Sequence, residues 1–273
     1  MLATAVIFAR ESLEASLIVA IIFSYLKQIH APPNLYGQVW TGILIALTID
    51  GFLGMVIWFT IHAYTGTSLQ TILEALTYVL AAILLTGMSF WMKNQSPHLK
   101  RDLQEHVEKS LNDSKRWALV LLAGITVGRE GLETTVFILA LSFHTTSGAM
   151  ILGALIGLGI GIYASYAIYH LGRGLPLRTF FNVFGTLLLI FASALLADGV
   201  EDFQNIHWLP GGHWILWNTG HFLSESSVLG DILHTFVGYA QSPTGLQMGV
   251  YVGFLLLTIP RYLKVSPKIP VRS

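Results

Sequence analysis

Residues 10–14 read Arg-Glu-Ser-Leu-Glu, and residues 129–133 read Arg-Glu-Gly-Leu-Glu. Both stretches have the pattern R-E-x-L-E, and both lie inside apolar segments that are long enough to cross a bilayer. A charged side chain at the centre of a membrane helix costs roughly 2.5–3.5 kcal/mol on insertion scales. An apolar fold does not need such charges, so the two motifs predict a functional site inside a membrane.

The composition places the chain among integral membrane proteins. Of its 273 residues, 53% are hydrophobic and 11% are charged, whereas about 25% of residues are charged in soluble proteins. The mean hydropathy is +0.64. The formal net charge is zero, which gives no electrostatic reason to expect a nucleic-acid partner. The absence of cysteine excludes disulfides, thiolate metal sites and cysteine nucleophiles.

Apolar windows of about 20 residues predict an all-α, polytopic membrane protein with seven transmembrane helices. The first window is expected to be a retained span rather than a cleaved signal peptide, because charges interrupt its apolar run. The predicted spans are 3–27, 38–63, 69–92, 117–142, 147–170, 179–203 and 246–263.

The lysines and arginines predict the orientation of these spans. Apart from the two motif arginines, all of them lie on one side, in the loops 28–37, 93–116 and 171–178, in the C-terminal tail, or at the adjoining helix ends. Basic residues mark the cytoplasmic side of a membrane. We therefore expect a multi-pass protein of a plasma membrane or bacterial inner membrane, with its N-terminus outside and its C-terminus cytoplasmic.

The two motifs begin two units of three spans each. Because the number of spans per unit is odd, the second unit enters from the opposite side, which predicts a 3+3 inverted repeat whose motifs meet near mid-bilayer. Gly128 and Gly131 flank or lie within the second motif and would permit close helix approach. The predicted parts are a first repeat at 1–92, a cytoplasmic amphipathic connector at 93–116, a second repeat at 117–203, an outer loop at 204–245, and a seventh helix with its tail at 246–273.

Each motif offers two carboxylates and one arginine on neighbouring positions of a helix. The two glutamates are three residues apart, and the arginine precedes the second glutamate by four, so all three can interact. Four carboxylates and two guanidinium groups leave a charge of −2, which protons or a cation should compensate. An all-oxygen ligand set favours hard cations, although each arginine could instead neutralise its own glutamates and pin the helices together. The predicted ligands are Glu11, Glu14, Glu130 and Glu133, with Arg10 and Arg129 as their basic partners.

Further acidic residues lie in or near the other spans. Asp198, Glu201 and Asp202 end the sixth span at the predicted outer face, where they could attract cations or could simply be solvated. Asp50 and Glu74 lie in or near the second and third spans. Either could be a buried proton carrier or a hydrogen-bonded structural group.

The predicted outer loop is rich in histidine. Asp231 and His234 have the i,i+3 spacing that suits a metal. The loop also holds three tryptophans, which are typical of packing at a membrane interface. We expect a structural role for each histidine of the loop: His207, His213, His221 and His234.

The paired motifs, the seven spans, the outside N-terminus and the acidic end of the sixth span resemble the oxidase-dependent iron permease family over about residues 1–263. That family includes the fungal high-affinity iron permease and the bacterial permease of a periplasmic tripartite iron-uptake system. The resemblance implies import of oxidised iron, with iron as substrate and no cofactor, next to an extracytoplasmic iron-oxidising or iron-delivering partner. It also implies that the motif glutamates are the iron ligands. The fungal outer-loop acidic motifs are only approximated here, which leaves the partner open.

Two other functions are alternatives to a ferric iron permease. One is a proton-coupled transporter of another hard divalent cation. The other is an intramembrane di-iron enzyme, which would usually add Glu-x-x-His elements. No histidine lies near either motif, so we predict a permease and no enzyme.

Overall fold

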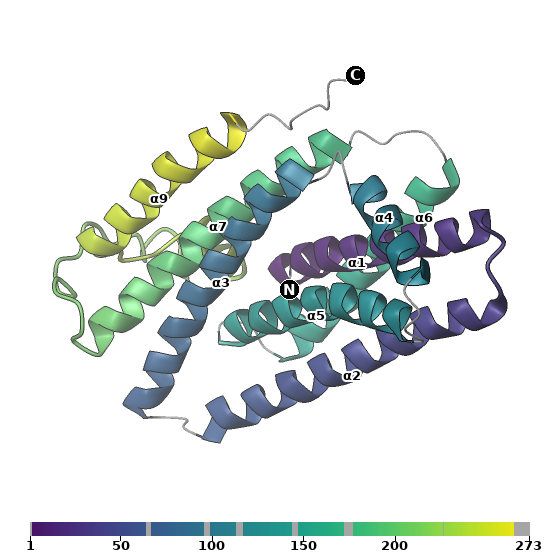
Figure 1. Cartoon of the computed structure of the whole chain (residues 1–273). Helices are drawn as coiled ribbons and strands as arrows, with labels where there is room; N and C mark the ends of the chain where they lie inside the picture. Colours follow the sequence, from purple (N-terminus) through teal and green to yellow (C-terminus); the bar gives the residue numbers. More distant parts are fainter. Residues whose placement is uncertain are drawn as a thin grey trace. The chain divides into compact units, whose positions relative to one another are not determined.

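The computed structural model describes residues 2–63, 67–95, 99–112, 117–143, 147–171, 177–225 and 227–264. These residues are almost entirely helical, and they contain no β-strand beyond an isolated bridge between Ile215 and Thr244. The all-α fold class is confirmed. The helices are α1 Leu2–Gln28, α2 Pro33–Ala63, α3 Ser68–Gln95, α4 Leu99–Asn112, α5 Ala118–Ser142, α6 Ser147–Leu171, α7 Leu177–Asn205, α8 Val228–Val237 and α9 Gly245–Lys264 (Figure 1).

Each of the seven predicted spans falls on one long helix of the structure. Within the described residues, five stretches are long and apolar enough to cross a membrane, so the chain is a multi-pass membrane protein. The two motif helices, α1 and α5, have 27 and 25 residues. Each carries three charged motif residues, which sets it apart from the five apolar stretches. The total of seven spans therefore stays a prediction. The five stretches are Pro33–Thr60, Ser68–Asn94, Gly148–Tyr166, Asn182–Asn205 and Gly245–Lys264.

Contacts group these helices into two compact units. The first comprises Met1–Phe59 and Pro97–Leu175, and the second comprises Thr60–Ser96 and Pro176–Ser273. Helices α1, α2, α4, α5 and α6 lie in the first unit, and α3, α7, α8 and α9 lie in the second. Both motifs therefore belong to the first unit, and the acidic end of α7 belongs to the second. This grouping by contact leaves the predicted division into repeats untested.

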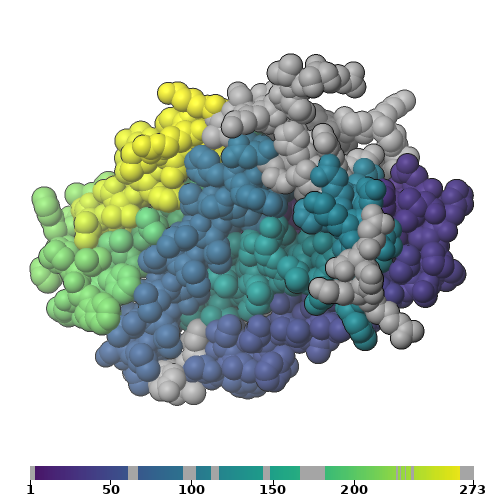
Figure 2. Space-filling model, in the orientation of Figure 1, coloured from purple at the N-terminus to yellow at the C-terminus, as the bar shows by residue number. Residues whose placement is uncertain are grey.

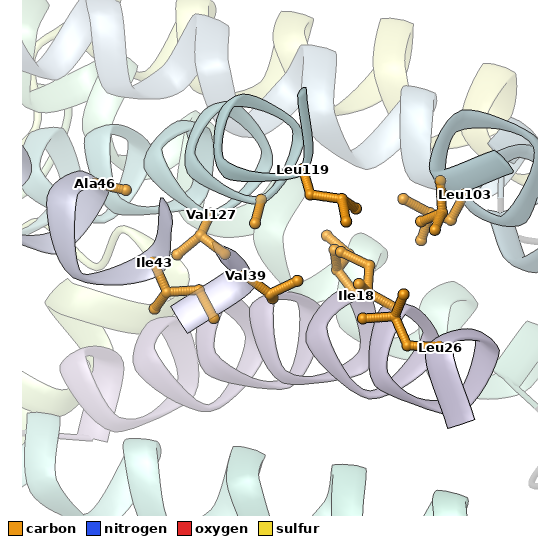
Figure 3. Close-up of a cluster of buried hydrophobic side chains, with 11 residues drawn as sticks. Ile18, Leu26, Val39, Ile43, Ala46, Leu103, Leu119 and Val127 are labelled. Atoms are coloured by element: carbon orange, nitrogen blue, oxygen red, sulfur yellow. The ribbon is translucent and has the colours of Figure 1, made fainter. Parts of the chain in front are cut away.

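A hydrophobic core joins four helices of the first unit (Figure 3). Leu103 and Val107 of α4 are one helical turn apart and are buried in it, whereas Glu105 and Glu108 on the same helix are exposed. The predicted amphipathic segment is thus a 14-residue amphipathic helix. The core residues are Ile18, Ile22, Leu26, Val39, Ile43, Ala46, Leu103, Val107, Leu119, Ala123 and Val127.

Glycines bring two pairs of helices in the first unit into backbone contact. A Cβ atom on Gly42 of α2 would lie 2.3 Å from the carbonyl oxygen of Val120 in α5. A Cβ atom on Gly157 of α6 would lie 2.3 Å from the carbonyl oxygen of Ala5 in α1. Neither glycine can be replaced without moving a backbone, and such close approach is typical of helix pairs in membranes. Helix α5 therefore packs on α2, and α1 packs on α6.

The second unit is built on α3, α7 and α9, with the loop that follows α7 bound to the start of α9. In this loop the Leu216 N–H donates to the Pro243 carbonyl (2.9 Å), and the Gly245 N–H donates to the Trp214 carbonyl (3.0 Å). Figure 2 shows the green surface of the loop region continuing into the yellow surface of α9. The short helix α8 begins after Ser227, whose hydroxyl accepts a bond from the Gly230 N–H (3.0 Å).

Candidate metal centre

The two R-E-x-L-E motifs lie where α1 and α5 cross. Phe8, near the start of α1, lines a cavity together with Leu139, near the end of α5. At the other ends of the two helices, Ile22 and Leu119 belong to the same core cluster. Helices α1 and α5 therefore run antiparallel, and their middle residues, which carry the motifs, come together.

Three carboxylates of the motifs are close enough to bind one ion. One oxygen each from Glu11, Glu130 and Glu133 lies within 4.8 Å of the others. Bonds from a hard cation to oxygen are about 2.0–2.6 Å long, so two ligands on opposite sides of one ion are about 4–5 Å apart. Glu11 and Glu130 are buried and Glu133 is half-buried. Among the residues that the structure describes, this is the one group of three or more potential metal ligands at such distances.

Each motif arginine pairs with both glutamates of its own motif. Arg10 binds Glu11 through Nη1, and its Nη2 lies 3.1 Å from Oε1 of Glu14. Arg129 Nη2 lies 2.6 Å from Oε1 of Glu130, and its Nε lies 3.7 Å from the carboxylate of Glu133. The arginines therefore orient their glutamates on the helix surface. They leave the second carboxylate oxygens for another partner.

Those second oxygens are buried and unsatisfied. The Oε2 atoms of Glu11, Glu14, Glu130 and Glu133 have no hydrogen-bond partner among the described residues. Leaving a buried polar group unsatisfied costs about 1–3 kcal/mol, and more if the group is charged. A bound cation would remove this cost for the three clustered glutamates. Glu14 lies outside the cluster and is held by Arg10.

One carboxylate beside the cluster was not among the predicted ligands, and the sequence left it as either a proton carrier or a structural group. Asp50 of α2 lines a cavity of about 480 Å³ together with Glu11 and Glu130. The sequence signal was a lone acid in an otherwise apolar span, which fits a structural group equally well. Its position against the second motif could not be read from the chain order.

The chain that carries these clustered glutamates matches a known protein family. Residues 1–263 match the model of the iron permease FTR1 family. The chain belongs to this iron permease family. The resemblance that we drew from the motifs is thereby confirmed, and the family is one of transporters.

Bacterial relatives match the chain over most of their length. The ferrous iron permease EfeU of Yersinia pestis is 33% identical over 257 residues, which cover 92% of this chain and 89% of the relative. The ferrous iron permease EfeU of Escherichia coli O157:H7 is 31% identical over 253 residues, covering 92% and 91%. No solved structure matches the chain.

Two of the three acidic residues at the end of α7, Asp198 and Glu201, contact neighbouring side chains. Asp198 is buried, and its Oδ2 lies 3.8 Å from Nε2 of His234, whose Nδ1 is 3.5 Å from Oε1 of Glu225. Glu201 accepts a hydrogen bond from the Gln247 amide (2.8 Å). These contacts lie within the second unit. Cation access through Asp198, Glu201 and Asp202 remains a prediction.

His234 is the outer-loop histidine with the most distinctive surroundings. Burial lowers its pKa, but the Asp198 carboxylate, the Tyr239 carbonyl and the Glu225 carboxylate together raise it above its usual value. The side chain of Asp231 lies outside the described residues, so the predicted Asp231–His234 pair cannot be compared. No described histidine of the loop belongs to a group of three metal ligands.

Proposed function

We propose that the chain is a permease that imports iron through the carboxylates of Glu11, Glu130 and Glu133. The observation that carries this proposal is the approach of their oxygens to within 4.8 Å of one another, from two helices of opposite direction. The family match supports transport, and the names of the bacterial relatives support iron. Iron is the substrate in this proposal, and no cofactor is invoked.

Arginine supplies part of the charge balance of the proposed site. The four motif glutamates, including Glu14, carry four negative charges when ionised, and Arg10 and Arg129 return two positive charges. The remaining charge of −2 is neutralised by one divalent ion and becomes +1 with one trivalent ion. Since residual charge is costly at low dielectric, the balance favours one ion for both motifs rather than one ion for each motif.

Both oxidation states of iron have support. The charge balance favours Fe²⁺, and so do the names of the bacterial relatives, which are ferrous iron permeases. The ferric ion that the sequence resemblance implies is the second candidate, because a ligand set made of carboxylate oxygens suits a hard Fe³⁺ ion. We propose Fe²⁺ as the ion that occupies the ionised cluster, and import of Fe³⁺ as the alternative.

We further propose that the two motif helices belong to a 3+3 inverted repeat, with α9 as a seventh span. The pattern of packing supports this. Helix α1 packs on α6, and α5 packs on α2. If α1, α2 and α3 of the first repeat correspond to α5, α6 and α7 of the second, these two contacts are equivalent. The proposed repeat also exchanges α3 with α7, and these two helices are in contact with each other.

The direction of the helices also supports the repeat. In the pair α2–α5, Gly42 meets Gly124 and Gly54 meets Thr135, so the two helices run parallel. Helices α1 and α5 run antiparallel, as the predicted orientation requires. With the basic residues inside, the N-terminus lies outside, the C-terminus is cytoplasmic, and an iron-oxidising or iron-delivering partner would act at the extracytoplasmic face.

Reconstitution of the purified full-length chain in liposomes tests the proposal. Uptake of radioactive iron is measured with Fe²⁺ under a reductant and with chelated Fe³⁺, and Mn²⁺ tests transport of another hard cation. Glu130→Gln should abolish most uptake, whereas Glu108→Gln, which removes an exposed glutamate of α4 in the same unit, should not. Equal uptake by the two variants would show that the cluster is not the transport site.

A further inference from the structure

Asp50 is a buried carboxylate with one unsatisfied oxygen in the middle of a membrane helix. Its exposed fraction is 6%, and its Oδ2 has no hydrogen-bond partner among the described residues. It is the single Asp, Glu, Lys or Arg residue of α2. Such a group is costly unless something compensates it, and Asp50 is not part of the group of three clustered glutamates.

The position of Asp50 depends on a glycine inside the second motif. A Cβ atom on Gly131 would lie 1.9 Å from Oδ2 of Asp50, so the carboxylate occupies the space that any other residue would fill. The first motif has Ser12 at the equivalent position, and its side chain faces α6, where a Cβ atom on Gly161 would lie 1.9 Å from the hydroxyl. The absence of a side chain at position 131 thus lets the Asp50 carboxylate lie against the residue that follows Glu130.

Asp50 shares a cavity with two of the proposed iron ligands. Glu11, Glu130 and Asp50 contribute the carboxylates that line this space of about 480 Å³. A water molecule occupies about 30 Å³ of liquid. An ion with about six water ligands therefore has room in the cavity. All of its lining residues belong to the first unit.

The cavity extends from the motifs toward one end of the helices. Beyond the carboxylates it is lined by Phe8 near the start of α1, Trp58 near the end of α2 and Leu139 near the end of α5. In the proposed orientation, these three helix ends lie on the extracytoplasmic side. The cavity therefore lies between that side and the carboxylate cluster.

We propose that Asp50 is a further cation ligand of the transport path, which takes iron in this cavity and passes it to Glu11 and Glu130. This inference rests on the proposed function. Glu11 and Glu130 each share their charge with an arginine. Arg129 pairs with the two glutamates of its own motif and borders a second groove, which Asp50 also lines. The unsatisfied Oδ2 of Asp50 thus offers a carboxylate oxygen to an incoming ion that is exchanging water for protein oxygens.

Transport kinetics test the role of Asp50. Asp50→Asn should raise the apparent KM for Fe²⁺ in liposomes about tenfold or more and leave iron binding to the purified protein at saturation intact, because the central ligands remain. Asp50→Glu should restore part of the affinity, and the control Glu108→Gln should match the unmodified chain. If Asp50→Asn behaves like Glu108→Gln while Glu130→Gln has lost uptake, the inference fails and the proposed function stands.

Cysteine labelling tests the cavity without a transport measurement, since the chain has no cysteine of its own. Thr134 lines the cavity, and its hydroxyl donates to the carbonyl four residues before it (2.7 Å). Thr126 makes the same bond (2.6 Å) on the same helix but is not a lining residue. A membrane-impermeant thiol reagent added outside should label Thr134→Cys and spare Thr126→Cys.

Iron should slow the labelling of Thr134→Cys, and adding Asp50→Asn should raise the iron concentration needed for this protection. Equal labelling of the two cysteines would show that the cavity is not the path from outside. Protection that is unaffected by Asp50→Asn would show that the ion in the cavity does not bind Asp50.

Discussion

Arg10 is buried and Arg129 is exposed, although the two residues occupy equivalent positions in the two copies of the motif. The Arg10 side chain is 4% exposed, and that of Arg129 is 43% exposed. Both contact two glutamates of their own helix. Protein therefore encloses the arginine of the first motif, whereas it leaves much of the arginine side chain of the second motif uncovered.

This difference predicts unequal effects of the two Arg→Lys substitutions. Lysine cannot reproduce the planar fork with which Arg10 reaches Glu11 and Glu14, so Arg10→Lys should lower iron uptake about tenfold or more. Arg129→Lys should lower uptake by no more than about threefold, because the Arg129 side chain is less enclosed and its Nε is already 3.7 Å from the Glu133 carboxylate. Uptake in liposomes at equal protein content checks this order. A larger loss in Arg129→Lys would contradict it.

The close approach of three carboxylates predicts non-additive substitutions. Glu130→Gln and Glu133→Gln should each abolish most uptake, and the double variant should lose little more, because ligands of one ion act as a unit. Iron bound per chain should be one ion in the unmodified protein, as measured by equilibrium binding. Losses that combine independently, with two ions bound, would indicate two separate sites.

The contact between Gly131 and Asp50 predicts a difference between two Gly→Ala substitutions on α5. Gly131→Ala places a methyl group 1.9 Å from Asp50 Oδ2, whereas Gly128→Ala reaches no closer than 3.4 Å to the Ala46 Cβ atom. Overpacking typically costs about 1–3 kcal/mol. Gly131→Ala should therefore lower the melting temperature and raise the KM for iron, and Gly128→Ala should be nearly neutral in both. Similar values for the two variants would show that Asp50 moves aside without consequence.

Much of the candidate site could be predicted by combining the motifs, the length of the spans and the odd number of spans in each repeat. The charges of Glu11 and Glu130 in apolar segments indicated a site, and the odd number of spans in each repeat indicated antiparallel motif helices. The exclusion of Glu14 from the group of three depends on the rotation of α1 about its axis. Helical spacing alone does not determine that rotation.

Two contacts between distant parts of the chain could not be predicted from the sequence. A structural role was expected for His234, but its partner could not be named from the sequence: the structure places it beside Asp198, which lies on another helix. Asp50 looked like an isolated acid because its neighbour, Gly131, has no side chain to suggest an interaction. Both contacts arise from packing between helices, which leaves no periodic signal in the sequence.

The surroundings of His234 predict a pH-dependent contribution to stability. Its pKa is raised in the folded protein, so its protonated form is stabilised there by the Asp198 and Glu225 carboxylates. The contribution is complete below the unfolded pKa of about 6.5 and is lost as the pH rises through the folded pKa. The melting temperature of the unmodified chain should exceed that of His234→Gln at pH 6, and the difference should shrink at higher pH. A difference that is constant with pH would exclude protonation as the cause.

The proposed orientation predicts opposite labelling of two introduced cysteines. His213 is exposed in the loop between α7 and α8, and Glu108 is exposed on α4. The first lies on the side without lysine or arginine and the second on the basic side, which is cytoplasmic under the positive-inside rule. In intact cells, an impermeant thiol reagent should label His213→Cys and leave Glu108→Cys unlabelled until the membrane is opened. The reverse pattern would place the N-terminus and the cavity beside Asp50 on the cytoplasmic side, and would make that cavity an exit rather than an access path.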